Sequence, residues 1–116
     1  MQTRTQILAQ KTFVAVSARK GKKEAAQYGN WALKLPTYVQ KNGLCVALAF
    51  AQTKTEAKPL LEDLQTVLEI KDLPALARTC EASQYLDLTR QTLAALGWFK
   101  RFAQAELEAK LDESNA

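Results

Sequence analysis

The last third of the chain carries a long row of mostly apolar residues spaced three or four positions apart. The row consists of Tyr85, Leu88, Thr92, Leu96, Phe99, Ala103 and Leu107. Residues spaced in this way lie on one face of an α-helix, because successive turns bring them into register. We therefore predict one long helix over residues 83–111, with an inward face that other elements must cover. The polar tail, residues 111–116, is predicted to be frayed.

Composition extends this prediction to the whole chain. Of the 116 residues, 47% are apolar and only four are Gly and three Pro, whereas Ala, Leu, Gln, Lys and Glu, which favour helices, are abundant. No β-branched stretch alternates over the length of a strand. We expect an all-α fold, a compact single-domain bundle of about six helices over residues 1–116. The expected helices cover residues 2–20, 24–41, 44–54, 59–70, 74–80 and 83–111.

Two of these segments carry more specific expectations. Pro36 falls inside the second helix, where it removes a backbone donor and clashes with the preceding turn, so we predict a kink or a break there. The third helix is apolar from Leu44 to Ala51, which predicts that it is the central, buried helix. Cys45 and Cys80 are predicted to be buried thiols rather than a disulfide.

The residues that most catalytic and metal sites need are scarce. The chain has no histidine and only two cysteines, so it lacks the commonest general base and cannot complete a four-ligand zinc site with cysteine alone. A Walker loop, a glycine-rich dinucleotide turn and a nucleophile elbow are also absent from the sequence. We predict a protein that is not an enzyme and needs no cofactor or metal.

Four carboxylates cluster in the second half of the chain: Glu62, Asp63, Glu69 and Asp72. We interpret this cluster as a solvated acidic face, with a magnesium site as the alternative.

Nothing in the sequence indicates a membrane protein. No apolar run approaches the ~20 residues that span a bilayer. The first eleven residues are too polar for a signal peptide. We therefore expect a cytoplasmic protein with no membrane partner.

The charge is distributed unevenly along the chain. Residues 1–58 contain ten basic and two acidic residues, a balance of +8, whereas residues 59–116 contain six basic and ten acidic residues, a balance of −4. Such asymmetry favours a polyanionic partner for the first half. The alternative is a soluble protein that simply has a basic end.

Two features of the basic half are candidate anion sites. Four cations surround Gly21 in the stretch from Arg19 to Lys23, and they repel one another unless an anion is bound; the alternative is an ordinary solvated loop. The second feature is a row of hydrogen-bond donors without a carboxylate on one face of the second helix, opposite its apolar stripe. Such a face suits a phosphate backbone, although plain solvent exposure and displacement by the Pro36 kink remain alternatives. The row consists of Lys23, Gln27, Asn30, Lys34, Thr37 and Lys41.

The last helix carries a different kind of candidate site. Trp98 does not belong to the inward stripe and shares a face with Arg90, Gly97 and Arg101. Tryptophan with flanking arginine is typical of protein–protein hot spots, and Gly97 allows another surface to approach closely. The alternative is that Trp98 packs on the first helix of its own chain. Lys100 is predicted to lie on the inward side, either snorkelling to solvent or marking an anion-binding cleft.

Three pieces of sequence, in this order and at this length, resemble a known family. They are Tyr28 through Lys34-Leu35-Pro36, then Asn42-Gly43-Leu44 leading to Ala49-Phe50, then Tyr85 to Trp98-Phe99-Lys100-Arg101-Phe102-Ala103. Together they resemble the small subunit of the type III-B CRISPR–Cas effector, the Cmr complex, over about residues 3–110. No single piece is diagnostic.

The resemblance implies a compact helical bundle without catalytic residues. Copies of such a subunit stack along an antiviral ribonucleoprotein filament, contact other Cmr subunits, and present basic surface to the guide RNA and target RNA. On this basis the nucleic-acid-binding role is transferred to Lys34, Lys100 and Arg101. The same role for four further lysines comes from the charge argument alone: Lys20, Lys22, Lys23 and Lys41.

The sequence thus predicts a structural subunit that binds RNA backbone. The alternative is a helical protein–protein adaptor without nucleic-acid contact, with Arg90, Gly97 and Trp98 as its interface. A helix-turn-helix regulator that recognises a DNA sequence as a dimer is a third hypothesis, although no segment shows its short helix, tight turn and recognition helix clearly. An enzyme is not excluded.

Overall fold

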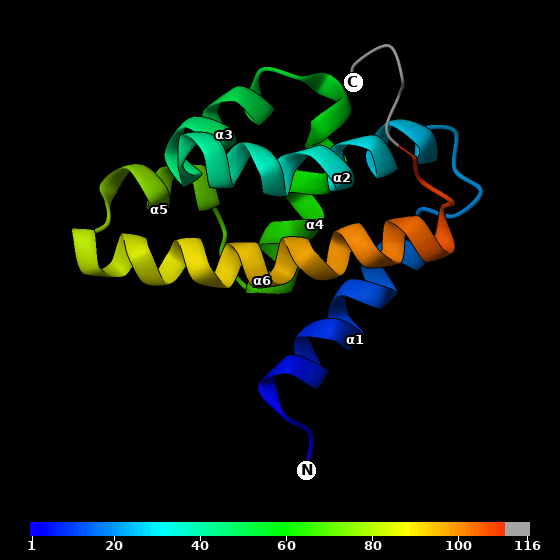
Figure 1. Ribbon diagram of the computed structural model, residues 1–116, viewed down its shortest axis with the longest axis horizontal. Coiled ribbons are helices and arrows are strands. Elements are labelled where there is room, and N and C mark those ends of the chain that lie inside the picture. The colour runs from blue at the N-terminus through cyan, green and yellow to red at the C-terminus, as the bar shows by residue number, and fades with distance from the viewer. Residues whose placement is uncertain (111–116) are drawn as a thin grey trace.

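Six α-helices and one short 3-10 helix make up the computed structural model, which describes residues 1–110 (Figure 1). The helices are α1 (Arg4–Ser17), α2 (Ala25–Asn42), α3 (Leu44–Gln52), η1 (Thr55–Ala57), α4 (Lys58–Leu68), α5 (Leu73–Thr79) and α6 (Ala82–Glu106). No strand occurs in this part of the chain. The predicted all-α fold of about six helices is confirmed. The tail that was expected to fray, residues 111–116, lies outside the described residues.

The longest helix, α6, lies along one side of the molecule, and α2 runs antiparallel beside it (Figure 1). At one end of this pair the Tyr85 hydroxyl accepts a hydrogen bond of 3.0 Å from the backbone N–H of Cys45. At the other end a Cβ on Gly29 would lie 2.8 Å from the Cβ of Ala109. Glycine at position 29 therefore permits the close approach of α2 to the chain that follows α6.

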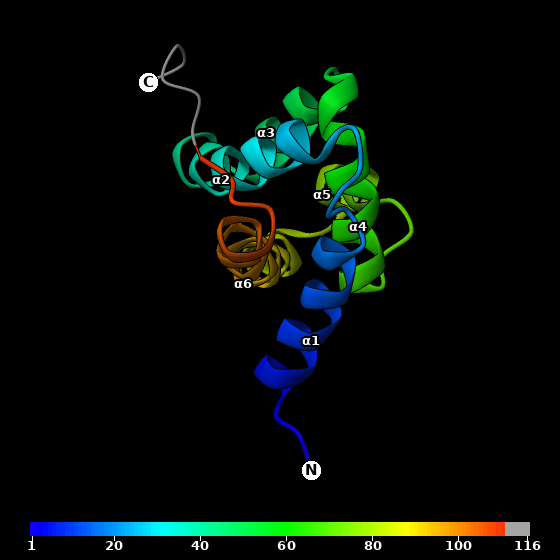
Figure 2. The ribbon, with the colours of Figure 1, turned by 90° about the vertical axis from the view of Figure 1, so that its right-hand side faces the viewer.

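α1 packs against α6 and α4, and its first turns project away from the other helices (Figures 1 and 2). The helix begins with a capping box, in which Thr3 and Gln6 satisfy each other's backbone N–H groups. Its last residue is Ser17, so the chain leaves the helix before the basic stretch begins. This early exit places the cations of residues 19–23 in a connection rather than on a helix.

The core lies where α2, α3, α4 and α6 meet. Leu35, Leu48, Leu64, Leu96 and Phe99 are among its fully buried side chains, and each such burial stabilises the fold by roughly 2 kcal/mol. The inward stripe predicted for the last helix is confirmed in its middle, and its two ends are half-buried. No helix among residues 1–110 is long and apolar enough to cross a membrane.

α2 passes through Pro36 without interruption, so the predicted break does not occur. Proline in a helix interior costs about 3 kcal/mol because one hydrogen bond is lost and the ring crowds the preceding turn. Leu35 and Val39 are buried on either side of it. Burial of that stripe offsets the local cost, and the helix continues to Asn42.

The prediction that the third helix is central and buried is wrong. Leu44, Ala47 and Leu48 are buried, but Val46 and Phe50 on the other side of α3 are 58% and 40% exposed. α3 lies at the surface of the bundle (Figure 1), so its neighbours cover only one face. A continuous apolar run cannot distinguish a fully surrounded helix from one that offers an apolar face to solvent or to a partner.

Both cysteines are less buried than predicted. Cys45 and Cys80 are free thiols, but each is half-buried rather than buried. Cys45 packs beside the core at the start of α3, and Cys80 follows the last residue of α5.

Candidate nucleic-acid interface

Arg19 differs from the lysines of the basic stretch, because its side chain is bound to another part of the molecule. Its Nε and Nη2 atoms each donate a hydrogen bond of 3.0 Å to the carboxylate of Asp63 on α4. The Tyr28 hydroxyl donates to the same carboxylate at 2.6 Å, and the Arg19 guanidinium lies 5.2 Å from the centre of the Tyr28 ring. The group is therefore a structural link between the α1–α2 connection, α2 and α4.

Burial and hydrogen bonding shift the proton affinity of Tyr28 and Arg19. Burial, together with the hydrogen bond to Asp63, raises the pKa of Tyr28 far above its ordinary value. The hydrogen bond to Asp63 likewise raises the pKa of Arg19. The expectation of four unneutralised cations around Gly21 is thus wrong for Arg19, because the chain supplies its anion.

The other three cations of the stretch point to solvent. Lys20, Lys22 and Lys23 are exposed between α1 and α2, and Gly21 adopts a left-handed conformation with φ +78°, as its predicted place in a turn requires. Ion pairs among residues 1–110 are confined to Lys11–Glu69 and Arg19–Asp63. The three lysines therefore keep their charge available to an external anion.

The donor row predicted for the second helix lies on α2, apart from Lys23. Lys23 precedes the helix, and the continuous helix carries the rest of the row, so Pro36 does not break it at Thr37 and Lys41. Thr37 and Lys41 are exposed, as is Gln27, whereas Asn30 and Lys34 are half-buried. No carboxylate in the described part of the chain pairs with a lysine of this row.

Lys34 extends into a cleft between α2 and α3 that sequence reasoning missed. The cleft has a volume of about 390 Å³. Its walls include three aromatic rings in mutual contact, with ring centres 5.4 to 6.2 Å apart. We refer to it as the aromatic cleft, and its lining residues are Gln27, Asn30, Trp31, Lys34, Tyr38, Phe50, Lys54 and Glu56.

Two lysines of the aromatic cleft lie against its rings. The Lys34 Nζ is 5.8 Å from the centre of the Trp31 ring, and the Lys54 Nζ is 5.4 Å from that of Phe50. Lys34 was predicted as a binding residue, but Tyr38, Phe50 and Lys54 were not. The spacing of four between Phe50 and Lys54 was the available signal, although it does not reveal which helix they face.

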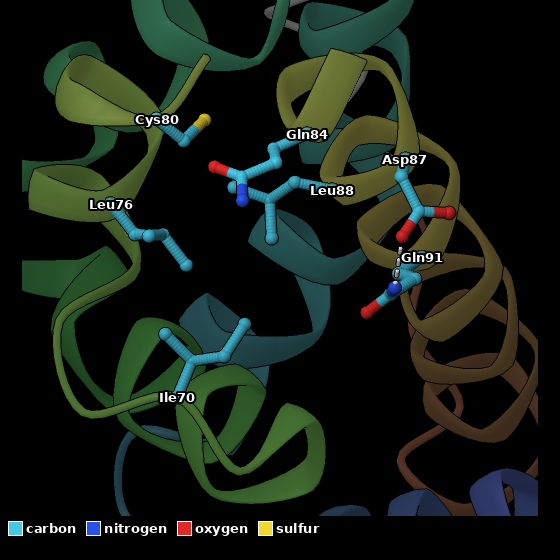
Figure 3. A pocket seen from close by; sticks show the side chains of 7 residues that line it. All are labelled: Ile70, Leu76, Cys80, Gln84, Asp87, Leu88 and Gln91. Atoms are coloured by element: carbon cyan, nitrogen blue, oxygen red, sulfur yellow. Dashed lines mark hydrogen bonds between the residues drawn. The ribbon is translucent and has the colours of Figure 1, made fainter.

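A second cleft, between α5 and α6, has the opposite electrostatic character (Figure 3). It measures about 250 Å³ and contains no lysine or arginine. Its one charged residue is Asp87, whose carboxylate accepts a hydrogen bond of 2.8 Å from the Gln91 amide. A phosphate group would meet a carboxylate here without a compensating cation, so this cleft does not suit nucleic acid. Its walls are formed by Ile70, Leu76, Cys80, Gln84, Asp87, Leu88 and Gln91.

Three of the four carboxylates of the predicted acidic face have separate structural roles, and the fourth, Glu62, is exposed. Asp63 binds Arg19 and Tyr28, Glu69 lies 3.5 Å from Lys11, and the Asp72 side chain accepts a hydrogen bond from the backbone of Ala75 at the start of α5. Residues 1–110 contain no group of three or more His, Cys, Asp or Glu that could hold a metal ion.

α6 places Lys100 and Arg101 in solvent. Lys100 is exposed, which agrees with the predicted alternative of a side chain that reaches solvent. Both residues occupy a different helix from the donor row. The seven predicted nucleic-acid-binding residues therefore fall into three groups: the α1–α2 connection, α2 and α6.

The predicted protein interface has an aromatic centre. Trp98 is half-buried and stacks on Phe102 with ring centres 5.5 Å apart, and Phe102 meets the edge of Phe13 on α1 at 5.4 Å. Arg90 is exposed, and a Cβ on Gly97 would meet nothing within 4 Å. Trp98 is thus linked to α1 through Phe102, and part of its side chain stays accessible to solvent.

Comparison with known proteins gives a consistent result. A family model described as "CRISPR-associated protein (Cas_Cmr5)" matches residues 4–106. The protein "CRISPR system Cmr subunit Cmr5" of Thermus thermophilus is 46% identical over 113 residues, which cover 93% of this chain and 99% of that protein. The crystal structure of a CRISPR-associated Cmr5 family protein from the same organism superposes with a TM-score of 0.86 at 45% identity, covering 90% of this chain and 97% of that one. On this evidence the chain belongs to the Cmr5 family of CRISPR-associated proteins.

Proposed function

We propose that this chain is a non-catalytic structural subunit of a cytoplasmic CRISPR Cmr complex and binds the sugar–phosphate backbone of guide or target RNA. One observation carries the proposal: the lysines of α2 and of the α1–α2 connection form no ion pair with carboxylates of residues 1–110. The Thermus thermophilus relative is named as a Cmr subunit. Other Cmr subunits and stacked copies of this chain are its proposed protein partners.

The physical requirements of such a subunit agree with this surface. In an RNA-guided complex, base pairing supplies the sequence specificity, while the protein recognises shape and backbone. Lysine offers a compact charge with three donors, which suits phosphate without selecting a base. Binding should therefore be independent of sequence and should weaken steeply as salt concentration rises.

A double charge reversal tests the proposal. The changes Lys34→Glu and Lys41→Glu alter the net charge by −4 and place two carboxylates against the backbone. We expect RNA affinity to fall by about tenfold or more, since a phosphate that no lysine neutralises keeps its counterions and contributes no binding free energy. The control reverses Lys71 and Arg78, two exposed residues of the acidic half, with the same change in net charge. Unchanged RNA binding by both the free protein and the assembled complex after the α2 reversal contradicts the proposal.

The accessible face of Trp98 supports a second role, contact with another subunit. A half-buried indole stacked on Phe102, beside the open surface at Gly97, has the composition of an interface hot spot. We expect Trp98→Ala to abolish co-purification with the complex while circular dichroism stays helical. Leu86→Ala removes a more exposed apolar side chain from the same helix and serves as the control. Recovery of an intact complex carrying Trp98→Ala refutes this role.

A further inference from the structure

We propose that the aromatic cleft between α2 and α3 binds one unpaired nucleotide of an RNA strand, with its base stacked on the Phe50 ring beside Tyr38 and its phosphate held by Lys34 and Lys54. The inference rests on the proposed function, because it assumes that RNA lies along α2. It adds a base-dependent contact to a surface otherwise suited to backbone alone.

The rings provide a platform of the right kind. Trp31 is 7% exposed and forms the floor of the cleft, whereas Phe50 is 40% exposed. Tyr38 meets Phe50 edge to face, with ring centres 5.4 Å apart and planes at 78°. Nucleobases of every type stack on aromatic side chains, because each base offers a flat π-surface. An aromatic side chain this exposed on the uncovered face of α3 is stabilised when such a ligand covers it.

The charges select an anionic ligand. Lys34 and Lys54 place their ammonium groups over the Trp31 and Phe50 rings, and neither forms an ion pair within residues 1–110. Lysine over an aromatic ring repels a cationic ligand, so a quaternary ammonium group does not suit this cleft. An arriving base would replace the Lys54 ammonium on the Phe50 ring, and the flexible lysine stem keeps that ammonium within reach of the phosphate.

The polar rim suits a nucleotide better than a simple backbone contact. Asn30 lines the cleft, and its buried Oδ1 atom has no hydrogen-bond partner in the described part of the chain. The Asn30 side-chain oxygen is therefore available to accept a hydrogen bond from the edge of a base. Glu56 adds one acceptor, which suits a ribose hydroxyl or a base amino group but disfavours a run of phosphates.

The size of the cleft limits what enters. A volume of about 390 Å³ lies within the range of small-ligand sites, roughly 300 to 1,000 Å³, and is too small for a duplex. A paired base has both faces covered by its neighbours in the stack. Only an unpaired nucleotide presents a free face together with a phosphate, which are the two groups that this cleft recognises.

The test compares two ligands of equal charge: an RNA oligoadenylate and an abasic strand with the same number of phosphates. Fluorescence anisotropy should show the free protein binding oligoadenylate about tenfold more tightly, the preference expected from stacking one base. Phe50→Leu keeps an apolar side chain but removes the ring, and should lower the affinity for oligoadenylate to that of the abasic strand. Val46→Ala, on the exposed face of the same helix, should keep the preference.

A structural readout guards against misfolding of the variant. Ring-proton NMR signals of Phe50 and Tyr38 in the unaltered protein should shift clearly further with oligoadenylate than with the abasic strand, because only a stacked base adds its ring current. Equal affinity for both strands overturns the nucleotide site but leaves backbone binding intact. Binding of neither strand contradicts both proposals. If Phe50→Leu retains the base preference but releases a neighbouring subunit from the complex, the cleft is a protein contact and the inference is wrong.

Discussion

Two regions of the molecule each hold two cationic side chains, yet different groups lie opposite those cations. One is the face formed by Lys11, Arg19, Asp63 and Glu69, which we call the α1–α4 face, and the other is the aromatic cleft. On the first, Arg19 and Lys11 face the carboxylates of Asp63 and Glu69. On the second, Lys34 and Lys54 face aromatic rings, which attract a cation without neutralising it. Net charge therefore does not distinguish the two regions. The identity of each cation's neighbour does, since a carboxylate satisfies the charge and a ring leaves it available to an external anion.

The two ion pairs of the α1–α4 face also differ from each other. Arg19 and Asp63 are 23% and 17% exposed, and their contact is bidentate. Lys11 and Glu69 are 42% and 78% exposed and 3.5 Å apart, so water screens them. The first pair should matter for stability, and the second should contribute little.

The largest effect is expected from Asp63→Ala. The change leaves the Arg19 guanidinium and the Tyr28 hydroxyl without their acceptor, and should lower the free energy of unfolding by about 3 kcal/mol. Urea denaturation followed by circular dichroism measures it. A decrease below about 1 kcal/mol would show that the α1–α4 face does not differ from an ordinary solvated surface.

Neutralising the cleft lysines should affect binding rather than stability. The double change Lys34→Gln and Lys54→Gln should reduce RNA affinity by about tenfold and lower the slope of log affinity against log salt by about 0.7 for each phosphate that is no longer neutralised. Lys11→Gln, whose cation already faces Glu69, provides the matched control and should leave the slope unchanged. An equal effect of the control on the slope removes the distinction between the two faces.

Tyr28→Phe should reduce stability by about 1 kcal/mol at neutral pH, because it removes one hydrogen bond to a carboxylate. Burial raises the pKa of Tyr28 in the folded state above the unfolded value of about 10. The stability contributed by this group is therefore complete below pH ~10 and is lost as pH rises towards the higher folded pKa. The unaltered protein should lose more stability than Tyr28→Phe between about pH 10 and 12, as measured by urea denaturation. If the free energy of unfolding falls equally with pH in the unaltered protein and in Tyr28→Phe, the Tyr28 hydroxyl is solvated.

The smallest effect is expected from Glu69→Gln, which removes the exposed partner of Lys11. The free energy of unfolding should change by no more than about 0.5 kcal/mol, because water competes for both groups. Thermal and urea unfolding of Glu69→Gln and of Asp63→Ala measure how much stability each ion pair contributes. A decrease comparable to that of Asp63→Ala would mean that exposure does not separate the two pairs.

Local residue spacing was enough to specify the helices and most of their inward faces. The spacing of Leu88, Leu96 and Phe99 specified the buried face of α6, and Gly21 marked the turn before α2. These are local properties, because helix periodicity and a positive φ depend on residues close in sequence. The donor row on α2 was visible for the same reason.

The tertiary structure alone decided which side chains meet. Arg19 and Asp63 are 44 residues apart, and no local pattern indicates that one neutralises the other. The exposure of Phe50, and its meeting with Trp31 and Tyr38 across two helices, likewise depends on how α3 docks on α2. A helical pattern specifies a direction around its own axis, whereas the neighbour in that direction is set by packing of the whole bundle. That physical difference is why the basic surface could be predicted, and the cleft within it could not.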